Sequence, residues 1–195
     1  DKGFTVVQLM SVNSWALDDF RNHYGDTPYD DPTTLNLPYW EHVGWVIDEI
    51  GRRGMYALLV VGTPLRDDDK HGPILQTLDE AYRYGHALGE LYRDKPNLIW
   101  SNGIDVNPDN WKSHSPAGME GWHALAEGVY DGVSGEGEYD GHADWSAALM
   151  TYHCAGARTS GDWFHHVPWL SFNGAQLGFI NLIPRLREDY NRRPA

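Results

Sequence analysis

An amide and a carboxylate follow a short apolar stretch within residues 94–108. This segment stops a helix at Lys-Pro-Asn, continues through apolar residues 98–100, and ends with Asn102 and Asp105 in Ser-Asn-Gly-Ile-Asp. Parallel α/β sheets build active sites from side chains at the C-terminal ends of buried strands. We therefore predict that Asp105 belongs to an active site. The alternative is that Asp105 only shapes a turn, because Asp close to Asn-Pro is common turn chemistry.

Apolar, β-branched stretches alternate with segments of helical periodicity along the chain. Strands are expected at residues 4–10, 56–62, 98–100, 149–154 and 170–176, and helices beginning near residues 38, 77, 119 and 182. Thr77 and Glu80 have the spacing of a capping box. Gly85 and Gly89 are expected to let the second helix pack closely on the sheet.

Strand and helix in regular succession predict the α/β class with a parallel sheet. An eight-stranded α/β barrel takes roughly 250 residues, which is more than this chain has. We therefore predict a partial (β/α)8 TIM barrel of about five strands, roughly the second to the sixth. An open five-stranded sheet is the alternative. Residues 1–195 are interpreted as a fragment of a single catalytic barrel domain that is cut from a longer protein.

Composition narrows the range of partners. The formal net charge of −13 argues against nucleic acid, whose phosphates it would repel. No apolar run approaches the roughly 20 residues of a membrane helix, so no membrane partner is expected.

One cysteine, Cys154, excludes an internal disulfide. Nine Trp and eleven Tyr suit a packed core and, around a cleft, stacking on the flat faces of sugar rings.

Polar and aromatic side chains follow the expected strands at their C-terminal ends, which converge on one mouth in a barrel. The residues assigned to this site are Asn13, Trp15, Asn102, Asp105, Tyr152, His153, Asn173 and Gln176. We expect the aromatic side chains of the mouth to bury Asp105. A carboxylate with amides and aromatic walls is typical of glycoside cleavage, which ordinarily needs two carboxylates. Asp105 is the one convincing candidate.

Other chemistries fit less well. No Gly-x-Ser-x-Gly elbow is present, and Cys154 is expected to point away from its neighbour His153 in a strand. The His residues show neither His-x-His after the first strand nor His-Glu-x-x-His. We predict no cofactor and no metal, and a metal-dependent hydrolase on an α/β barrel stays as an alternative.

Several motifs in order carry a family resemblance. They are Gly-Phe-Thr-Val-Val-Gln at residues 3–8, Pro-Tyr-Trp at 38–40, Pro-Asn-Leu-Ile-Trp at 96–100, Gly-Ile-Asp at 103–105, Thr-Tyr-His at 151–153, and Trp-Leu-Ser-Phe-Asn at 169–173 followed by Gln176. The chain resembles the apiosidase-like glycoside hydrolases, glycoside hydrolase family 140 and its relatives, long catalogued as a domain of unknown function.

This resemblance implies a retaining glycoside hydrolase that acts on plant cell-wall oligosaccharides or polysaccharides. It implies that Asp105, after the fourth barrel strand, is the general acid, and that a seventh-strand Glu beyond Ala195 is the nucleophile. The remaining site residues would bind sugar hydroxyls, with Trp15 stacking on a ring. The excised chain alone would be inactive, and a secreted or periplasmic location is implied for the parent protein.

Two departures from the family pattern concern the substrate. The family commonly has Gly-Gly-Asp where this chain has Gly-Ile-Asp at 103–105, and Gln-Ser-Gly-His where it has Gln-Leu-Gly-Phe at 176–179. The second departure removes a Ser and a His near the mouth, which leaves the sugar and linkage open. A non-catalytic carbohydrate-binding barrel is a further alternative.

Overall fold

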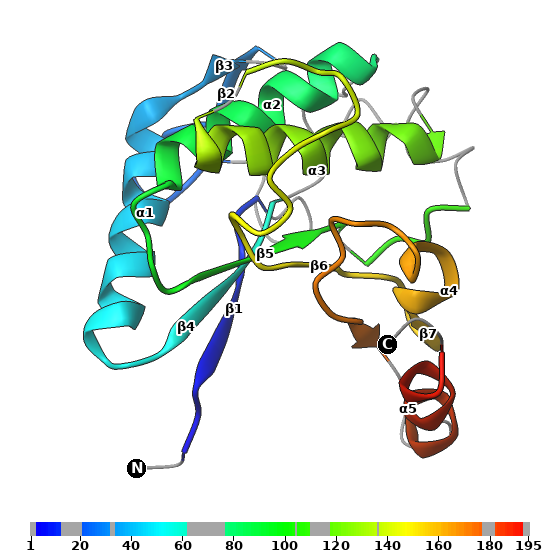
Figure 1. The fold of residues 1–195 in the computed structure, drawn as a ribbon. Coiled ribbons are helices and arrows are strands. Elements are labelled where there is room, and N and C mark those ends of the chain that lie inside the picture. The colour runs from blue at the N-terminus through cyan, green and yellow to red at the C-terminus, as the bar shows by residue number, and fades with distance from the viewer. Residues whose placement is uncertain are drawn as a thin grey trace.

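The computed structural model describes residues 3–12, 21–31, 34–61, 77–103, 105–109, 118–135, 137–176 and 182–192. Its centre is a four-stranded parallel sheet in the order β1, β4, β5, β6 (Figure 1). The strands are β1 (Val6–Met10), β4 (Tyr56–Val60), β5 (Leu98–Asn102) and β6 (Met150–Tyr152). The connecting helices are α1 (Leu37–Arg52), α2 (Leu78–Tyr92) and α3 (Gly118–Ser134). This order confirms the predicted α/β class and fits a partial barrel.

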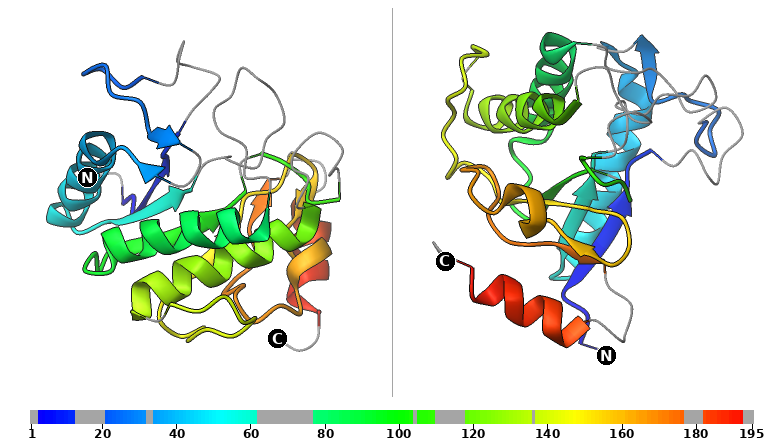
Figure 2. Two further views of the ribbon diagram at one scale, coloured as in Figure 1. Left: turned by 90° about the horizontal axis from the view of Figure 1, so that it is seen from above. Right: turned by 90° about the vertical axis from the view of Figure 1, so that its right-hand side faces the viewer.

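Smaller elements surround the sheet. They are β2 (Tyr29–Asp31), β3 (Thr34–Leu35), β7 (Arg158–Thr159), α4 (Gly161–Phe164), β8 (Ala175–Gln176) and α5 (Leu182–Tyr190). β2 and β3 form an antiparallel pair before α1, and β7 and β8 form another beyond β6. α4 and α5 lie at one end of the molecule, beside the β7–β8 pair (Figures 1 and 2). No described helix has the length and apolar character to cross a membrane.

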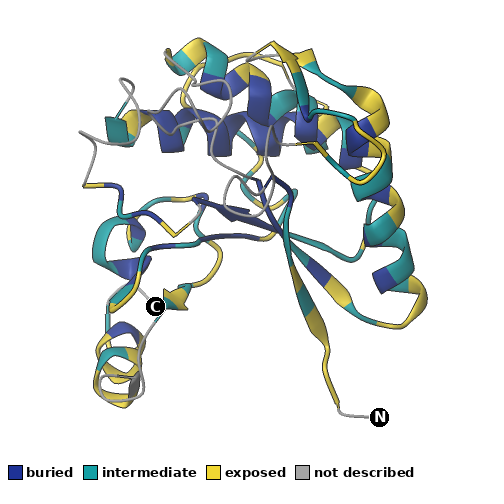
Figure 3. Ribbon diagram, turned by 180° about the vertical axis from the view of Figure 1, so that it is seen from behind, coloured by how far each residue is buried: buried dark blue, intermediate teal, exposed yellow. Residues whose placement is uncertain are grey.

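The two faces of the sheet differ in burial. Leu59, Trp100 and Met150 point toward the helices and are buried. On the opposite face, the paired residues Val6 and Tyr56 keep 44% and 49% of their surface exposed (Figure 3). In a closed α/β barrel the helices lie outside and the other face is the interior. The face that carries Val6 and Tyr56 is therefore the inner face of the partial barrel, and it is buried further along, at Val60 and Ser101.

Local sequence signals explain where the helices begin and end. α2 has the predicted capping box, in which the Thr77 hydroxyl accepts from the Glu80 amide and the Glu80 carboxylate accepts from the Thr77 amide. Pro38 lies in the first turn of α1, where its missing N–H is tolerated. Gly54, with φ 72°, ends α1 in the left-handed conformation.

α2 and α3 lie side by side at backbone contact (Figure 2, left). A Cβ added at Gly85 or Gly89 would overlap the carbonyl oxygens of α3, and one at Gly128 or Gly132 would overlap those of α2. The prediction that Gly85 and Gly89 pack closely on the sheet was therefore wrong, because their close contact is with α3. The close approach is between helices, and each glycine's cost in helix propensity is compensated there.

The predicted strand at residues 170–176 was also wrong over most of its length. The segment runs beside β6, but side-chain hydroxyls take part in the contact: the Met150 amide donates to Ser171 Oγ, and Thr151 Oγ1 donates to the Phe172 carbonyl. A Cβ at Gly174 would lie 2.6 Å from the Tyr152 carbonyl oxygen. Only Ala175–Gln176 forms a strand, and it pairs antiparallel with β7. The described parallel sheet therefore has four strands.

Replacing Gly128 by Ala should destabilise the protein by about 1–3 kcal/mol, because the new Cβ meets the α2 backbone, which cannot move aside as a side chain can. Gly44→Ala in α1 is the matched control. Its Cβ would meet only side-chain atoms, the nearest 3.3 Å away, so stability should stay within about 1 kcal/mol of the wild type. Urea unfolding of both variants measures the difference, and equal midpoints would contradict the backbone contact.

His123 should make stability depend on pH. Its Nδ1 accepts from Trp169 Nε1 at 2.9 Å, and burial lowers its pKa below the ordinary 6.5. The unfolded chain therefore binds the proton more tightly, so stability is lost as pH falls below about 6.5, by at most about 1.4 kcal/mol per pH unit. Unfolding at several pH values should show a shallower decline for His123→Gln. Parallel curves would show that His123 titrates alike in both states.

Candidate active site

The C-terminal ends of β4, β5 and β6 meet at one edge of the sheet. The Val61 amide donates to the Ser101 carbonyl at 3.0 Å, and the His153 amide donates to the Asn102 carbonyl at 2.7 Å. These bonds continue the parallel ladder beyond the strands themselves. The segments that follow β5 and β6 therefore start side by side, as the sequence predicted for an active-site edge.

Asp105 lies three residues after β5 and has φ 51°. A non-glycine residue in this left-handed region costs roughly 1–2 kcal/mol, although Asp tolerates it better than most residues. Such strain persists where surrounding contacts impose it, and it is concentrated at functional sites. The side chain is exposed, so the expectation that aromatic residues bury Asp105 is not met in this chain.

Contacts with β6 and with the segment after it hold the backbone on both sides of Asp105. The Tyr152 hydroxyl donates to the Val106 carbonyl at 3.2 Å, and the Ala155 amide donates to Asn107 Oδ1 at 3.1 Å. On the other side, Gly103 (φ 71°) packs against β6, since a Cβ there would lie 2.6 Å from the Tyr152 ring. The backbone around Asp105 is thus fixed at both ends relative to β6.

A pocket of about 270 Å³ opens on the inner face of the sheet near the ends of β5 and β6. Its polar lining residues come from the strands and from β8: Gln8, Ser101, Thr151, His153 and Gln176. Leu58 and Phe172 add apolar walls. A concave site with an apolar wall and a few convergent polar groups is typical of a small-molecule site.

His153 and Gln176 meet in this pocket. His153 Nε2 lies 2.9 Å from Gln176 Oε1, an atom that only accepts, so Nε2 carries the proton in this arrangement. Nδ1 is buried and has no hydrogen-bond partner among the described residues. The structure therefore brings together two of the predicted site residues from segments 23 positions apart.

Asn102 and Tyr152 lie elsewhere, although both were predicted to bind sugar. Asn102 is fully buried on the helix-covered face, where its Nδ2 donates to the Trp122 carbonyl at 3.0 Å. Tyr152 borders the pocket, yet its side chain is fully buried, with its ring 5.3 Å from Trp122 and its hydroxyl on Val106. Both side chains join the sheet to its helices and loops and are closed to a ligand.

Sequence reasoning missed Ser101 and Thr151, which line the pocket. Neighbours in a strand point to opposite faces. Assigning His153 to the inner face therefore places Thr151 there and Tyr152 with the helices, and the same alternation separates Ser101 from Asn102. Asn173 is half-buried next to α4, where a Cβ on Gly161 would lie 2.9 Å from its Nδ2. Asn13 and Trp15 lie outside the described residues.

Cys154 also borders the pocket, but its thiol is expected to be unreactive. Its thiol is buried and donates to the Arg158 carbonyl at 3.2 Å. Burial raises the pKa of this thiol, which keeps it protonated and a poor nucleophile. The part of the chain that the structure describes holds no cluster of three or more His, Cys, Asp or Glu side chains that would bind a metal ion.

Comparison with models of known protein families shows which family the chain belongs to. A family model described as "Apiosidase-like, catalytic domain" matches residues 1–195. The chain is a member of the apiosidase-like family. This confirms the resemblance carried by the motifs at residues 96–105 and 151–153. No protein of curated function matches the apiosidase-like domain in sequence.

Solved structures agree with this assignment. A structure titled "Glycoside hydrolase" superimposes with a TM-score of 0.66 at 28% identity, over 88% of the apiosidase-like domain and 34% of that chain. A structure titled as a glycoside hydrolase family 5 protein from Bacteroides vulgatus gives 0.67 at 31% identity, over 89% and 34% respectively. The domain therefore has a glycoside hydrolase-like fold and spans about a third of the length of these relatives.

Gly103→Ala should displace the backbone that carries Asp105. It combines the left-handed strain of an alanine with a clash against Tyr152, for a loss of about 2–4 kcal/mol. Gly54→Ala is the matched control, because Gly54 has nearly the same φ, 72°, and no atom within 4 Å of its added Cβ. The difference between the two variants in thermal unfolding measures the packing alone. Equal losses would mean that residue 103 is not held against β6.

Proposed function

We propose that the protein to which this chain belongs is a retaining glycoside hydrolase that acts on plant cell-wall glycans, with Asp105 as its general acid and base. Asp105 would protonate the leaving oxygen and then activate the water that releases the product. The observation that carries this proposal is its position: a carboxylate in strained, left-handed backbone directly after a central strand of an apiosidase-like domain. Asp also adopts left-handed backbone in ordinary turns, so the feature that favours the active-site role is the position of Asp105 after a central strand of an apiosidase-like domain.

A retaining mechanism requires a second carboxylate, with the two carboxyl groups only about 5–5.5 Å apart. We propose that this nucleophile comes from the two thirds of the relatives' length that this chain does not span. The same remainder would cover the exposed inner face beside Val6 and Tyr56 and complete the barrel. On this proposal the 195-residue chain alone does not turn over glycosides.

The pocket on the inner face suits a sugar unit of the substrate. His153 and Gln176, which are half-buried, offer imidazole and amide groups to sugar hydroxyls, and the exposed Phe172 offers an apolar wall. The chain's charge of −13 favours a neutral over an acidic glycan. A plant polymer outside the cell requires an enzyme that meets it there, so a secreted or periplasmic location remains our proposal.

Asp105→Asn in the full-length protein should lower kcat/KM by about 10²–10⁴-fold on substrates with a poor leaving group. A dinitrophenyl glycoside, which leaves without protonation, should form the glycosyl-enzyme at a nearly normal rate, and added azide should restore turnover. Steady-state kinetics with both substrates measures this contrast. Asp94→Asn is the control, since Asp94 is an exposed carboxylate at the opposite end of β5 and should leave both rates unchanged.

The same experiment separates the alternatives. A carbohydrate-binding barrel predicts no turnover by the wild type and glycan binding that Asp105→Asn leaves intact. A metal-dependent hydrolase predicts activity that a chelator removes and that Asp105→Asn lowers equally for both leaving groups. Either outcome would replace the two-carboxylate proposal.

A further inference from the structure

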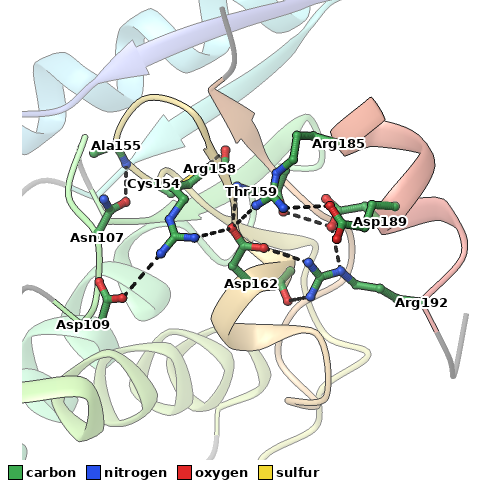
Figure 4. Close-up of polar contacts among 12 residues, drawn as sticks. Asn107, Asp109, Cys154, Ala155, Arg158, Thr159, Asp162, Arg185, Asp189 and Arg192 are labelled. Carbon is green, nitrogen blue, oxygen red and sulfur yellow. Dashed lines mark hydrogen bonds and ion pairs between the residues drawn. The ribbon is translucent and has the colours of Figure 1, made fainter. Parts of the chain in front are cut away.

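A chain of alternating charges runs from the Asp105 loop to α5 (Figure 4). We call residues 105–109 the acid loop. Asp109, at its end, lies 3.7 Å from Arg158 Nη2, and Arg158 Nη1 lies 3.6 Å from Asp162 on α4. Asp162 in turn binds Arg185 at 2.5 Å and Arg192 at 2.7 Å. Segments separated by more than 80 residues are thus joined through one aspartate and one arginine.

Arg158 is the link between the acid loop and the rest of this network. Its guanidinium lies 5.0 Å from the centre of the Trp163 ring, which fixes its plane between the two aspartates. Its backbone is also tied down, because Arg158 pairs with Gln176 between β7 and β8 and accepts from the Cys154 thiol. The residue that contacts Asp109 is therefore built on the strand whose partner, Gln176, binds His153 in the pocket.

The far side of the network has shorter contacts between less exposed side chains. Asp162 is nearly buried, and both of its oxygens are bound by arginines. Asp189 is also nearly buried; it accepts from Thr159 Oγ1 at 2.9 Å and pairs with Arg192 at 2.9 Å. Charge-assisted bonds to such nearly buried carboxylates fix geometry as well as contributing energy. α4, α5 and β7 thus form one frame, and Arg158 extends from it toward the acid loop.

The contact with Asp109 is different in character. Both side chains are about half exposed, at 43% and 51%, and their separation exceeds a hydrogen bond. Exposed ion pairs contribute little to stability. The reaction rate is more sensitive than stability to such a contact, because small displacements of a catalytic group from its working geometry lower the rate sharply. The contact is suited to holding the loop in position rather than holding the fold together.

We propose that Arg158 is a positioning residue: it holds the acid loop against the α4–α5 frame through Asp109 and so sets where Asp105 presents its proton. The inference rests on the proposed function of Asp105. It assigns Arg158 no contact with the substrate, and its effect is transmitted through the loop.

The test uses Arg158→Gln in the full-length protein. The expected result is a fall in kcat of about tenfold for a poor leaving group, with KM and the rate of glycosyl-enzyme formation from a dinitrophenyl glycoside within about twofold of the wild type, because that step needs no proton from Asp105. The thermal midpoint should not move. Hydrogen exchange of the acid-loop amides should become faster, which reports loop position without any assay of activity. Arg187→Gln, an exposed arginine on α5, is the matched control and should change none of these.

Asp109→Asn releases the same contact from the other side while leaving Arg158 and Asp162 in place, and it should reproduce the effect. Adding Arg158→Gln to it should bring no further loss. Unchanged exchange and unchanged kcat in Arg158→Gln, alongside a large loss in Asp105→Asn, would overturn this inference and leave the proposed function standing. A normal rate in Asp105→Asn would instead remove the proposed function, and exchange alone would then decide whether Arg158 holds the loop.

Discussion

Every part of the site depends on the parallel register of β4, β5 and β6. The ladder pairs Val60 with Ser101 and Ser101 with Thr151, so these side chains share the inner face. One residue further along, Asn102 and Tyr152 are paired and both turn toward the helices. A shift of one residue in any pair would exchange the two sets, because side chains alternate along a strand. The pocket, the buried amide and the support of the acid loop all follow from this single alignment.

Stability and position are supplied by different kinds of contact. Buried hydrogen bonds hold the helices in place. The Tyr92 hydroxyl donates to the Trp40 carbonyl at 2.6 Å, and the Tyr84 hydroxyl donates to the Val61 carbonyl at 2.6 Å. The loop after β5 depends on a few hydrogen bonds to the β6 segment and on an exposed ion pair. Functional segments are commonly drawn from the less stable part of a structure. Here the strained residue Asp105 lies in such a segment, directly beside a rigid one.

Much of the fold could be predicted from local patterns, since four strands and the main helices carry strong periodicity and the capping box of Thr77 and Glu80 is a complete local signal. The segment at residues 170–176 was mispredicted because hydroxyls of Thr151 and Ser171 replace ladder bonds there, a tertiary effect that no local pattern encodes. In the site, the contact of His153 with Gln176 follows from the convergence of strand ends, whereas Asp105 is not among the residues that line their pocket and its role stays a prediction. Asn102 was misassigned although alternation alone would have turned it toward the helices. The network through Arg158 has no sequence signal, because its members are joined only by the folded chain.

The close crossing of α2 and α3 limits how this domain can diverge. The spacing of the two helices is set by direct backbone contact at Gly85, Gly89, Gly128 and Gly132. A change of side-chain size elsewhere on these helices therefore cannot bring them nearer, and a larger residue at any of the four positions does not fit. The α2–α3 pair therefore forms a layer of fixed interhelical spacing against β5 and β6. The shape of the pocket can instead vary through inward-facing strand side chains such as Ser101 and Thr151 and through the segments that leave the strand ends, which can change without disturbing the helical layer.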